Sequence, residues 1–187
     1  LCLDIDPKHS PDLCMDILDF DETKYQKDYF HFIWASPDCR AYSSARTVAK
    51  ISRDEAMDAS DKLVAKTLQI ISWFGCPFCI ENPAMSRLWT RDVTAGLQCI
   101  TTSYCCHGYN YRKNTKLASN FLTNLPTCLG PGLCPAMVGG RHKEHAQKGG
   151  GGCLPRYKSR DELHTIPELL IREIFRQLNA GSETSKN

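Results

Sequence analysis

Most hydrophobic residues of the chain fall in short apolar runs that have the length of single β-strands. These runs cover residues 1–6, 13–18, 31–36, 78–83, 98–104 and 116–122. Between the third and fourth runs, residues 54–74 carry apolar side chains at every third or fourth position, which is the period of one helix face. Residues 84–95 show a shorter pattern of the same kind. This alternation of strands and helices predicts an α/β fold with a parallel or mixed sheet.

The predicted helices carry recognisable end signals. Ser52 and Glu55 fit a capping box at the start of the long helix, and Gly75 and Pro77 follow its last apolar residue. The shorter helix, residues 84–95, is expected to bury four side chains. They are Met85, Leu88, Trp89 and Val93.

The character of the chain changes after residue 125. Glycine and proline become dense and no periodicity is left until a C-terminal helix pattern resumes. We therefore expect four parts: a core at 1–125, an irregular insertion at 126–160, a helix at 161–180 that packs back on the core, and a polar tail at 181–187. The polar tail is expected to fray.

Composition constrains the number of domains, the binding partners and the cellular compartment that we expect for the protein. A length of 187 residues suits one domain, and a formal net charge of +2 is too small to indicate nucleic acid or a membrane surface, so any basic contact must be local. Eleven cysteines, an odd number in a chain of this size, favour reduced thiols in the cytoplasm or nucleus. No apolar run approaches the about 20 residues of a membrane span, and no segment resembles a secretory leader. We expect a soluble, intracellular monomer.

A cysteine follows the strand at 31–36. Pro37 ends the strand and Cys39 lies in the turn beyond it. In an open α/β sheet, ligands bind outside the carboxyl ends of the strands, and a thiol placed there can act as a nucleophile in its thiolate form. A small buried cysteine that only fills space is the alternative.

The dipeptide Glu81-Asn82 ends the next strand. A glutamate in apolar surroundings is costly to bury unless something is hydrogen-bonded to it, which suits it to hold a proton and donate it to a ring nitrogen. Carbon 5 of cytosine is a poor nucleophile until a thiolate adds at carbon 6 and a proton reaches nitrogen 3. Cys39 and Glu81 could supply these two operations. The alternative is a glutamate that is satisfied by backbone amides.

Two further acids follow early strands. Asp4 ends the first apolar run and Asp16 lies in the second, where carboxylates could accept hydrogen bonds from the ribose and adenine of a nucleotide-like cofactor. Each could equally be a turn or capping residue.

These motifs, in this order, resemble the cytosine-C5 DNA methyltransferase family and in particular its short viral or phage-like branch. The matching elements are Pro37-Asp38-Cys39 with Tyr42-Ser43, Glu81-Asn82, Leu3-Asp4, Asp16-Ile17, Tyr104 with Gly108, Arg112-Lys113-Asn114-Thr115, Thr123-Asn124 and Ile166-Pro167-Glu168-Leu169-Leu170. Each is weak alone, but their order and spacing are fairly specific. The resemblance covers residues 1–178.

The resemblance implies a Rossmann-like fold with helices on both faces of the sheet and S-adenosylmethionine as methyl donor. It implies double-stranded DNA as substrate, with a cytosine flipped out of the duplex. It assigns catalysis to Cys39, Glu81, Asn82 and Arg112. It assigns cofactor binding to Asp4, Asp16, Ile17 and Pro37.

Two departures from the family pattern follow from the sequence. Asp38 stands directly before the cysteine, where the family has proline, and its negative charge opposes ionisation of a neighbouring thiol. The glycine-rich turn that follows the family's first strand is absent, and the chain begins at Leu1 without a methionine. We expect that strand and turn to lie upstream of Leu1.

Late cysteines and histidines suggest a metal site. Cys128, Cys134, His142 and His145 offer four zinc ligands in the irregular insertion, with Cys153 as a substitute. Thiols without a metal are the alternative. Cys105-Cys106 carries no clear signal.

Basic residues mark the expected nucleic-acid contacts. The insertion is locally basic, and the resemblance places a target-recognition segment there. The predicted contacts are Ser43, Arg46, Lys113, Arg141 and Lys143. Two other functions stay open, namely a catalytically silent relative that binds nucleic acid or a partner, and a zinc-stabilised binding module.

Overall fold

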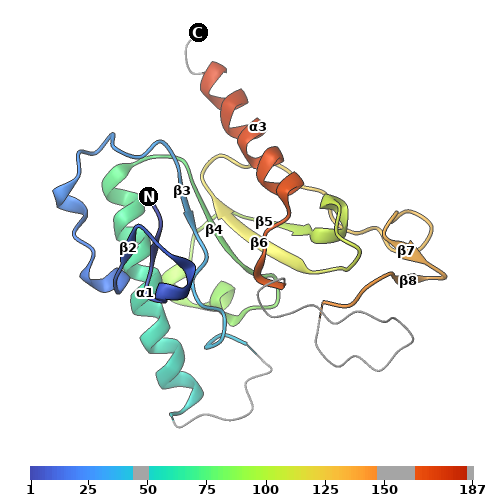
Figure 1. Ribbon diagram of the computed structural model, residues 1–187, viewed down its shortest axis with the longest axis horizontal. Helices are drawn as coiled ribbons and strands as arrows, with labels where there is room; N and C mark the ends of the chain where they lie inside the picture. The colour runs from blue at the N-terminus through green and yellow to red at the C-terminus, as the bar shows by residue number, and fades with distance from the viewer. Residues whose placement is uncertain (44–50, 147–162, 185–187) are drawn as a thin grey trace. The chain divides into compact units, whose positions relative to one another are not determined.

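The computed structural model describes residues 1–43, 51–146 and 163–184 and has a mixed α/β architecture (Figure 1). The chain divides into two compact units. The first contains Leu1–Asn82 and Ser86–Leu97, and the second contains Pro83–Met85 and Gln98–Asn187. The structure does not test the predicted division at residues 125 and 160. Among the described residues, no helix is both long enough and apolar enough to cross a membrane.

The first unit contains two pairs of parallel strands. Strand β1 (Leu3–Asp4) pairs with β2 (Leu13–Cys14), and β3 (Ile33–Ala35) pairs with β4 (Phe78–Pro83). The connections from β1 to β2 and from β2 to β3 contain short 3₁₀ turns in place of longer helices. These are η1 (Pro7–His9), η2 (Ile17–Asp19) and η3 (Glu22–Lys24).

The long helix α1 (Arg53–Phe74) confirms the predicted helix and both of its end signals (Figure 1). The Ser52 side chain accepts from the Glu55 backbone N–H, and the Glu55 carboxylate accepts from the Ser52 N–H. Gly75 ends the helix with a left-handed φ of 61°, a conformation that glycine adopts at low cost. The capping box satisfies donors that the first turn leaves unpaired.

One apolar cluster joins the helix to both strand pairs of the first unit. Phe20, Phe74 and Cys76 are buried at its centre, and Leu3, Leu13 and Ile33 pack against them. A second cluster contains Tyr42, Met57, Val64 and Leu88. Together the two clusters pack α1 against the strands and loops of the first unit.

The helix predicted at residues 84–95 is wrong. The segment forms two 3₁₀ turns, η4 (Arg87–Thr90) and η5 (Asp92–Thr94). Hydroxyl groups compete with a helical ladder here, because the Ser86 side chain accepts from the Leu88 N–H and the Thr94 hydroxyl donates to the Leu88 carbonyl. Leu88 is buried as expected, whereas Met85 is 88% exposed.

The second unit is built on an antiparallel pair of strands, which the apolar runs at 98–104 and 116–122 form. Strand β5 (Cys99–Ser103) pairs with β6 (Asn114–Ser119), and the 3₁₀ turn η6 (Tyr104–His107) follows β5. A much shorter hairpin, β7 (Met137–Val138) with β8 (Arg141–His142), lies in the glycine-rich segment. Its turn uses Gly139 and Gly140, which have positive φ angles of 57° and 79°.

Helix α3 (Glu168–Thr184) is the last element of the described residues. It buries Leu170 and Ile174 and extends into the segment 181–187 that was expected to be a tail. The Gln177 amide donates to the Asn124 carbonyl over 2.7 Å, and the Thr123 N–H donates to the Gln177 oxygen over 3.1 Å. These bonds hold α3 to the segment after β6.

Candidate active site

The parallel register of β3 and β4 places the predicted thiol loop beside the predicted glutamate. The paired residues are Ile33 with Phe78, Trp34 with Cys79, and Ala35 with Ile80. Continued by two residues, this register brings Glu81 and Asn82 next to Ser36 and Pro37. Both strands end here, so the two candidate groups come from the same edge.

A partly buried hydrogen bond joins the two strand ends. Asn82 Nδ2 donates to the Pro37 carbonyl over 2.8 Å, and Asn82 is 1% exposed. Glu81 is also buried, at 6% exposure. Burial of this Glu-Asn pair fixes the backbone immediately before Cys39.

The residues on either side of Cys39 form an ion pair. Arg40 Nη2 lies 2.6 Å from Asp38 Oδ2, and the Arg40 N–H also donates to the Asp38 carboxylate. Hydrogen bonding and charge from Asp38 raise the pKa of Arg40, and the negative charge of a Cys39 thiolate adds to the shift. The charge of Asp38, a departure from the family pattern, is therefore compensated two residues away.

The far end of the loop is anchored by Tyr42, which is fully buried. Its hydroxyl donates to Asp61 over 2.8 Å, and burial, followed by this bond, raises the pKa of Tyr42. Arg91 pairs with the same Asp61 over 2.6 Å, and the Arg87 N–H donates to the Tyr42 carbonyl. Cys39, which is partly exposed, thus lies on a turn held at both ends.

The predicted cofactor residues lie at the carboxyl ends of the other parallel pair. Asp4 ends β1 and its Oδ1 accepts from the Asp6 N–H over 2.8 Å. Asp16 caps η2, where its Oδ1 accepts from the Leu18 N–H over 2.9 Å, and Ile17 is half-buried behind it. Asp4 and Asp16 therefore act as turn or capping residues, as the alternative interpretation expects. Each hydrogen bond also orients the carboxylate that accepts it.

The basic residues differ in exposure and contacts. Arg112, Arg141 and Lys143 are exposed, whereas Lys113 is half-buried, with its Nζ donating to the Leu163 carbonyl over 2.9 Å. Ser43 is half-buried in the first unit. Arg46 lies outside the described residues.

The second unit gathers three of the four predicted metal ligands. The ligand atoms of Cys128, Cys134 and His142 lie within 4.8 Å of one another and of the Cys105 sulfur. His145 is not in this group, so its prediction as a ligand is corrected, and Cys105 takes the fourth place. Cys153 lies outside the described residues.

The thiols of this cluster are unequal. Burial raises the pKa of Cys105, and hydrogen bonds to the sulfur atoms of Cys128 and Cys134 add to it. Burial opposes ionisation of Cys128, but hydrogen bonds from the Gly130 backbone and Cys105 lower its pKa. The positive charge of Arg112 lowers it further.

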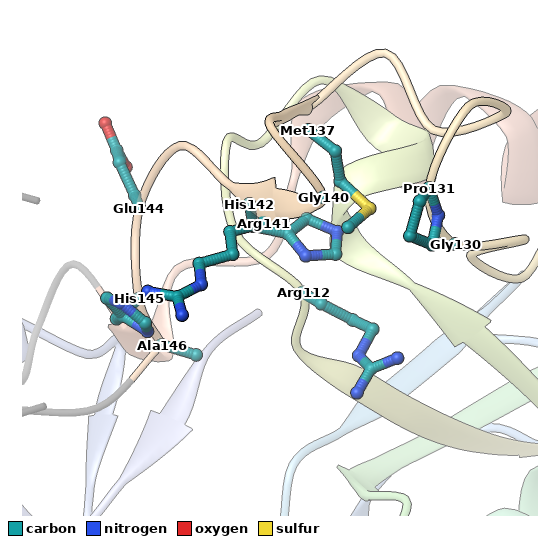
Figure 2. A pocket seen from close by; sticks show the side chains of 10 residues that line it. All are labelled: Arg112, Gly130, Pro131, Met137, Gly140, Arg141, His142, Glu144, His145 and Ala146. Carbon is teal, nitrogen blue, oxygen red and sulfur yellow. The ribbon is translucent and has the colours of Figure 1, made fainter. Parts of the chain in front are cut away.

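A pocket of about 460 Å³ adjoins the cluster (Figure 2). Arg112 lines one side, and Arg141, His142 and His145 line the other. Gly130, Pro131 and Met137 complete the wall near the cluster. Glu144 adds one carboxylate to the lining, so the basic side chains of the pocket outnumber the acidic one.

A buried glutamate beside a thiol loop, on neighbouring parallel strand ends, is an arrangement suited to covalent nucleophilic chemistry. No protein-family model matches the sequence. A probable DNA (cytosine-5)-methyltransferase of Frog virus 3 (isolate Goorha) is 28% identical to the chain over 190 residues, which cover 93% of this chain and 87% of the viral protein. This similarity supports the family predicted from the motifs, the cytosine-C5 DNA methyltransferases, and its viral branch.

Proposed function

We propose that this chain is a DNA (cytosine-5)-methyltransferase that uses S-adenosylmethionine and works through a covalent Cys39 adduct. The function named for the viral relative supports the general activity. The register of β3 and β4, which brings Glu81-Asn82 beside the loop of Cys39, is the observation that carries the mechanism.

Cys39 is the nucleophile in this proposal. Its thiolate adds to carbon 6 of the cytosine and forms an S–C bond. The electron pair of the 5,6 double bond shifts to a 4,5 double bond, and the pair of the 3,4 double bond moves onto nitrogen 3. Glu81 delivers a proton to nitrogen 3 in this proposal, so carbon 5 becomes an enamine carbon. After carbon 5 has been methylated, a base takes the carbon 5 proton and the thiolate of Cys39 is expelled as the 5,6 double bond re-forms. The proton on nitrogen 3 returns to Glu81.

The neighbouring residues position these two groups. Asn82 holds the loop through the Pro37 carbonyl, and the buried Glu81 carboxyl also meets the exocyclic amine of the base. Arg112 steadies the base or its carbonyl oxygen. Arg40 compensates Asp38 and attracts the thiolate of Cys39.

The strand ends of the first unit suit part of a nucleoside site. Asp4 and Asp16 follow two hydrogen-bonded parallel strands, and oriented carboxylates in that position can accept from ribose hydroxyls and an adenine amine. Ile17 and Pro37 would add apolar contact in a Rossmann-like fold. When bound, S-adenosylmethionine supplies an electrophilic methyl group.

The DNA contacts are proposed from exposed charge. Arg141 and Lys143 face solvent in the glycine-rich segment and can pair with phosphates, and Ser43 and Arg46 follow the cysteine loop. Lys113 is the weakest of the predicted contacts because its ammonium group already bonds within the chain. A flipped cytosine in duplex DNA, an intracellular location and a monomeric state belong to the same proposal.

Mechanism-based trapping tests the proposal. The protein is incubated with duplex DNA that contains 5-fluorocytosine and with labelled S-adenosylmethionine. Because fluorine cannot leave as the carbon 5 proton does, we expect a stable protein–DNA adduct, mapped to Cys39 by mass spectrometry. In ordinary duplex DNA we expect label at carbon 5 of cytosine.

Matched variants make the test specific. Cys39→Ser should abolish the adduct, whereas Cys14→Ser, an exposed thiol of the same unit, should retain it. Methyl transfer that persists in Cys39→Ser contradicts the mechanism. Binding of DNA with neither methyl transfer nor adduct favours the catalytically silent relative.

A further inference from the structure

The second unit contains a cluster with the composition of a metal centre. Sulfur atoms of three cysteines and one imidazole nitrogen lie within 4.8 Å of one another. The four residues are Cys105, Cys128, Cys134 and His142. They are buried or half-buried, so the thiols do not simply face solvent.

The spacing of these atoms matches the edges of a metal tetrahedron. With Zn–S near 2.3 Å and Zn–N near 2.05 Å, a tetrahedral site places sulfur and nitrogen ligands about 3.6 Å apart. His142 Nε2 lies 3.5 Å from Cys128 Sγ and 3.6 Å from Cys134 Sγ. A tetrahedral ion therefore fits these two edges without movement of Cys128, Cys134 or His142.

Hydrogen bonds hold the ligand-bearing segments independently of any ion. The Thr102 hydroxyl donates to the Pro126 carbonyl over 2.7 Å and lies 2.7 Å from Nε2 of the buried His107. The Ser103 hydroxyl accepts from the Cys128 N–H over 3.0 Å. These bonds tie the chain before Cys128 to the end of β5, next to Cys105.

In the described part of the glycine-rich segment, residues 126–146, few apolar side chains are buried. The buried centre of the cluster consists of Cys105, Cys134 and Ala136, with Met137 and two half-buried thiols packed against it. The large apolar side chains nearby face outward, since Leu129 is 72% exposed and Leu133 is 70% exposed. A segment with this little apolar burial gains its stability from a bound metal.

The surroundings also suit the charge of such a site. Three thiolates and a neutral imidazole around a divalent ion carry a net charge of −1. The guanidinium of Arg112 lines the same pocket as the ligand His142. One nearby cation can therefore balance the loaded site.

We infer that Cys105, Cys128, Cys134 and His142 bind one Zn²⁺ in a closed structural site. Thiolate and imidazole ligands in a tetrahedral arrangement select zinc among common divalent ions. Four protein ligands leave no open position, so the ion stabilises the glycine-rich segment and takes no part in methyl transfer. The inference is independent of the proposed function.

Metal analysis of the full chain tests the inference. Protein produced with zinc in the medium and purified under reducing conditions should contain about one zinc per chain. X-ray absorption should give three sulfur ligands and one nitrogen, at about 2.3 and 2.0 Å. Replacement of the zinc by Co²⁺ should produce a thiolate charge-transfer band and intense visible bands of tetrahedral cobalt.

Ligand and control variants separate this site from its alternatives. Cys105→Ser should weaken zinc binding at least about 100-fold in competition with a chromogenic chelator. His145→Ala and Cys99→Ser should bind zinc like the parent, and so should Cys39→Ser. Zinc retained by Cys105→Ser but lost by His145→Ala overturns the ligand set. A metal-free parent, or a disulfide within the cluster, overturns the site.

Discussion

Asn82 Nδ2 and the Pro37 carbonyl oxygen, 2.8 Å apart, form a partly buried hydrogen bond between two strand ends. One of these residues follows the candidate acid and the other precedes the turn that carries the candidate nucleophile. The bond therefore fixes the distance between two reacting groups through the backbone. A misplaced catalytic group costs rate more than binding.

Asn82→Ala should act on the chemical step. We expect kcat for methyl transfer to fall about 10- to 100-fold with the KM for S-adenosylmethionine little changed, because the Cys39 turn loses its anchor. Stability should fall by about 1 kcal/mol for the lost hydrogen bond. Steady-state kinetics and urea unfolding measure both effects. Asn179→Ala is the exposed control, and a rise in KM at constant kcat would contradict a positioning role.

Arg40→Ala should slow the reaction of Cys39 with an alkylating reagent. The guanidinium compensates Asp38, and without it the carboxylate faces the thiolate directly. Because the pair is largely solvent-exposed, we expect only an about two- to fivefold fall in the alkylation rate at neutral pH and low salt. Rates come from mass spectrometry of the Cys39 peptide. The double variant Asp38→Asn with Arg40→Ala should recover the rate, and no recovery would exclude this electrostatic coupling.

Glu173 should make stability depend on pH. Hydrogen bonds from Arg176 and Gln177 lower the pKa of Glu173 to about 2, below the about 4.3 of an unfolded glutamate. A lowered pKa stabilises the fold above the unfolded value, and the gain is lost as the pH falls from about 4.3 to 2. Allowing for partial exposure, Glu173→Gln should cost about 1 kcal/mol at pH 7 and nothing near pH 2.

Urea unfolding at several pH values measures the effect of Glu173. Glu168→Gln is the matched control, since its ion pair with Arg172 lies on the same helix but is exposed on both sides. Equal losses for Glu173→Gln at pH 7 and pH 3 would rule out the pH linkage.

Removal of the charge of Arg141 should change the salt dependence of DNA binding, whereas removal of the charge of Lys113 should change stability. Arg141→Gln should reduce the slope of log affinity against log salt by about 0.9 for each phosphate contact removed. Lys113→Met should leave that slope unchanged and lower the melting temperature instead, since Nζ bonds to Leu163 and lies 4.7 Å from the centre of the Tyr104 ring. Fluorescence anisotropy over a salt series and thermal unfolding separate the two, and a reduced slope for Lys113→Met would reverse the assignment.

Elements with strong local signals could be predicted from the sequence. Helix α1 has a complete capping box, a sustained apolar period and a glycine at its end, and β4 is an apolar run bounded by prolines. The segment 84–95 has a similar apolar period, but Ser86 and Thr94 hydroxyls bond the backbone within it. The spacing of apolar residues alone does not show that side-chain hydroxyls compete with helical backbone hydrogen bonds.

Only those site residues that follow adjacent strands could be predicted together from the sequence. Glu81 and Cys39 follow neighbouring parallel strands, so strand order is enough to bring them together. Cys105 could not be chosen from the sequence, because it stands beside Cys106 and 23 positions before Cys128. Only the fold of η6 and the hydrogen bonds to Pro126 bring that sulfur to the other three.

The hydrogen bond from Thr102 to Pro126 also lowers the entropy cost that metal binding has to overcome. Bringing Cys128 back to Cys105 closes a long loop, whose entropy cost is about 3 kcal/mol plus a constant at this length. Hydrogen bonds on β5 already close that loop, with His107 packed behind them. An ion then has only the two short loops to Cys134 and His142 left to order. Its affinity should therefore depend on Thr102, a residue that does not touch it.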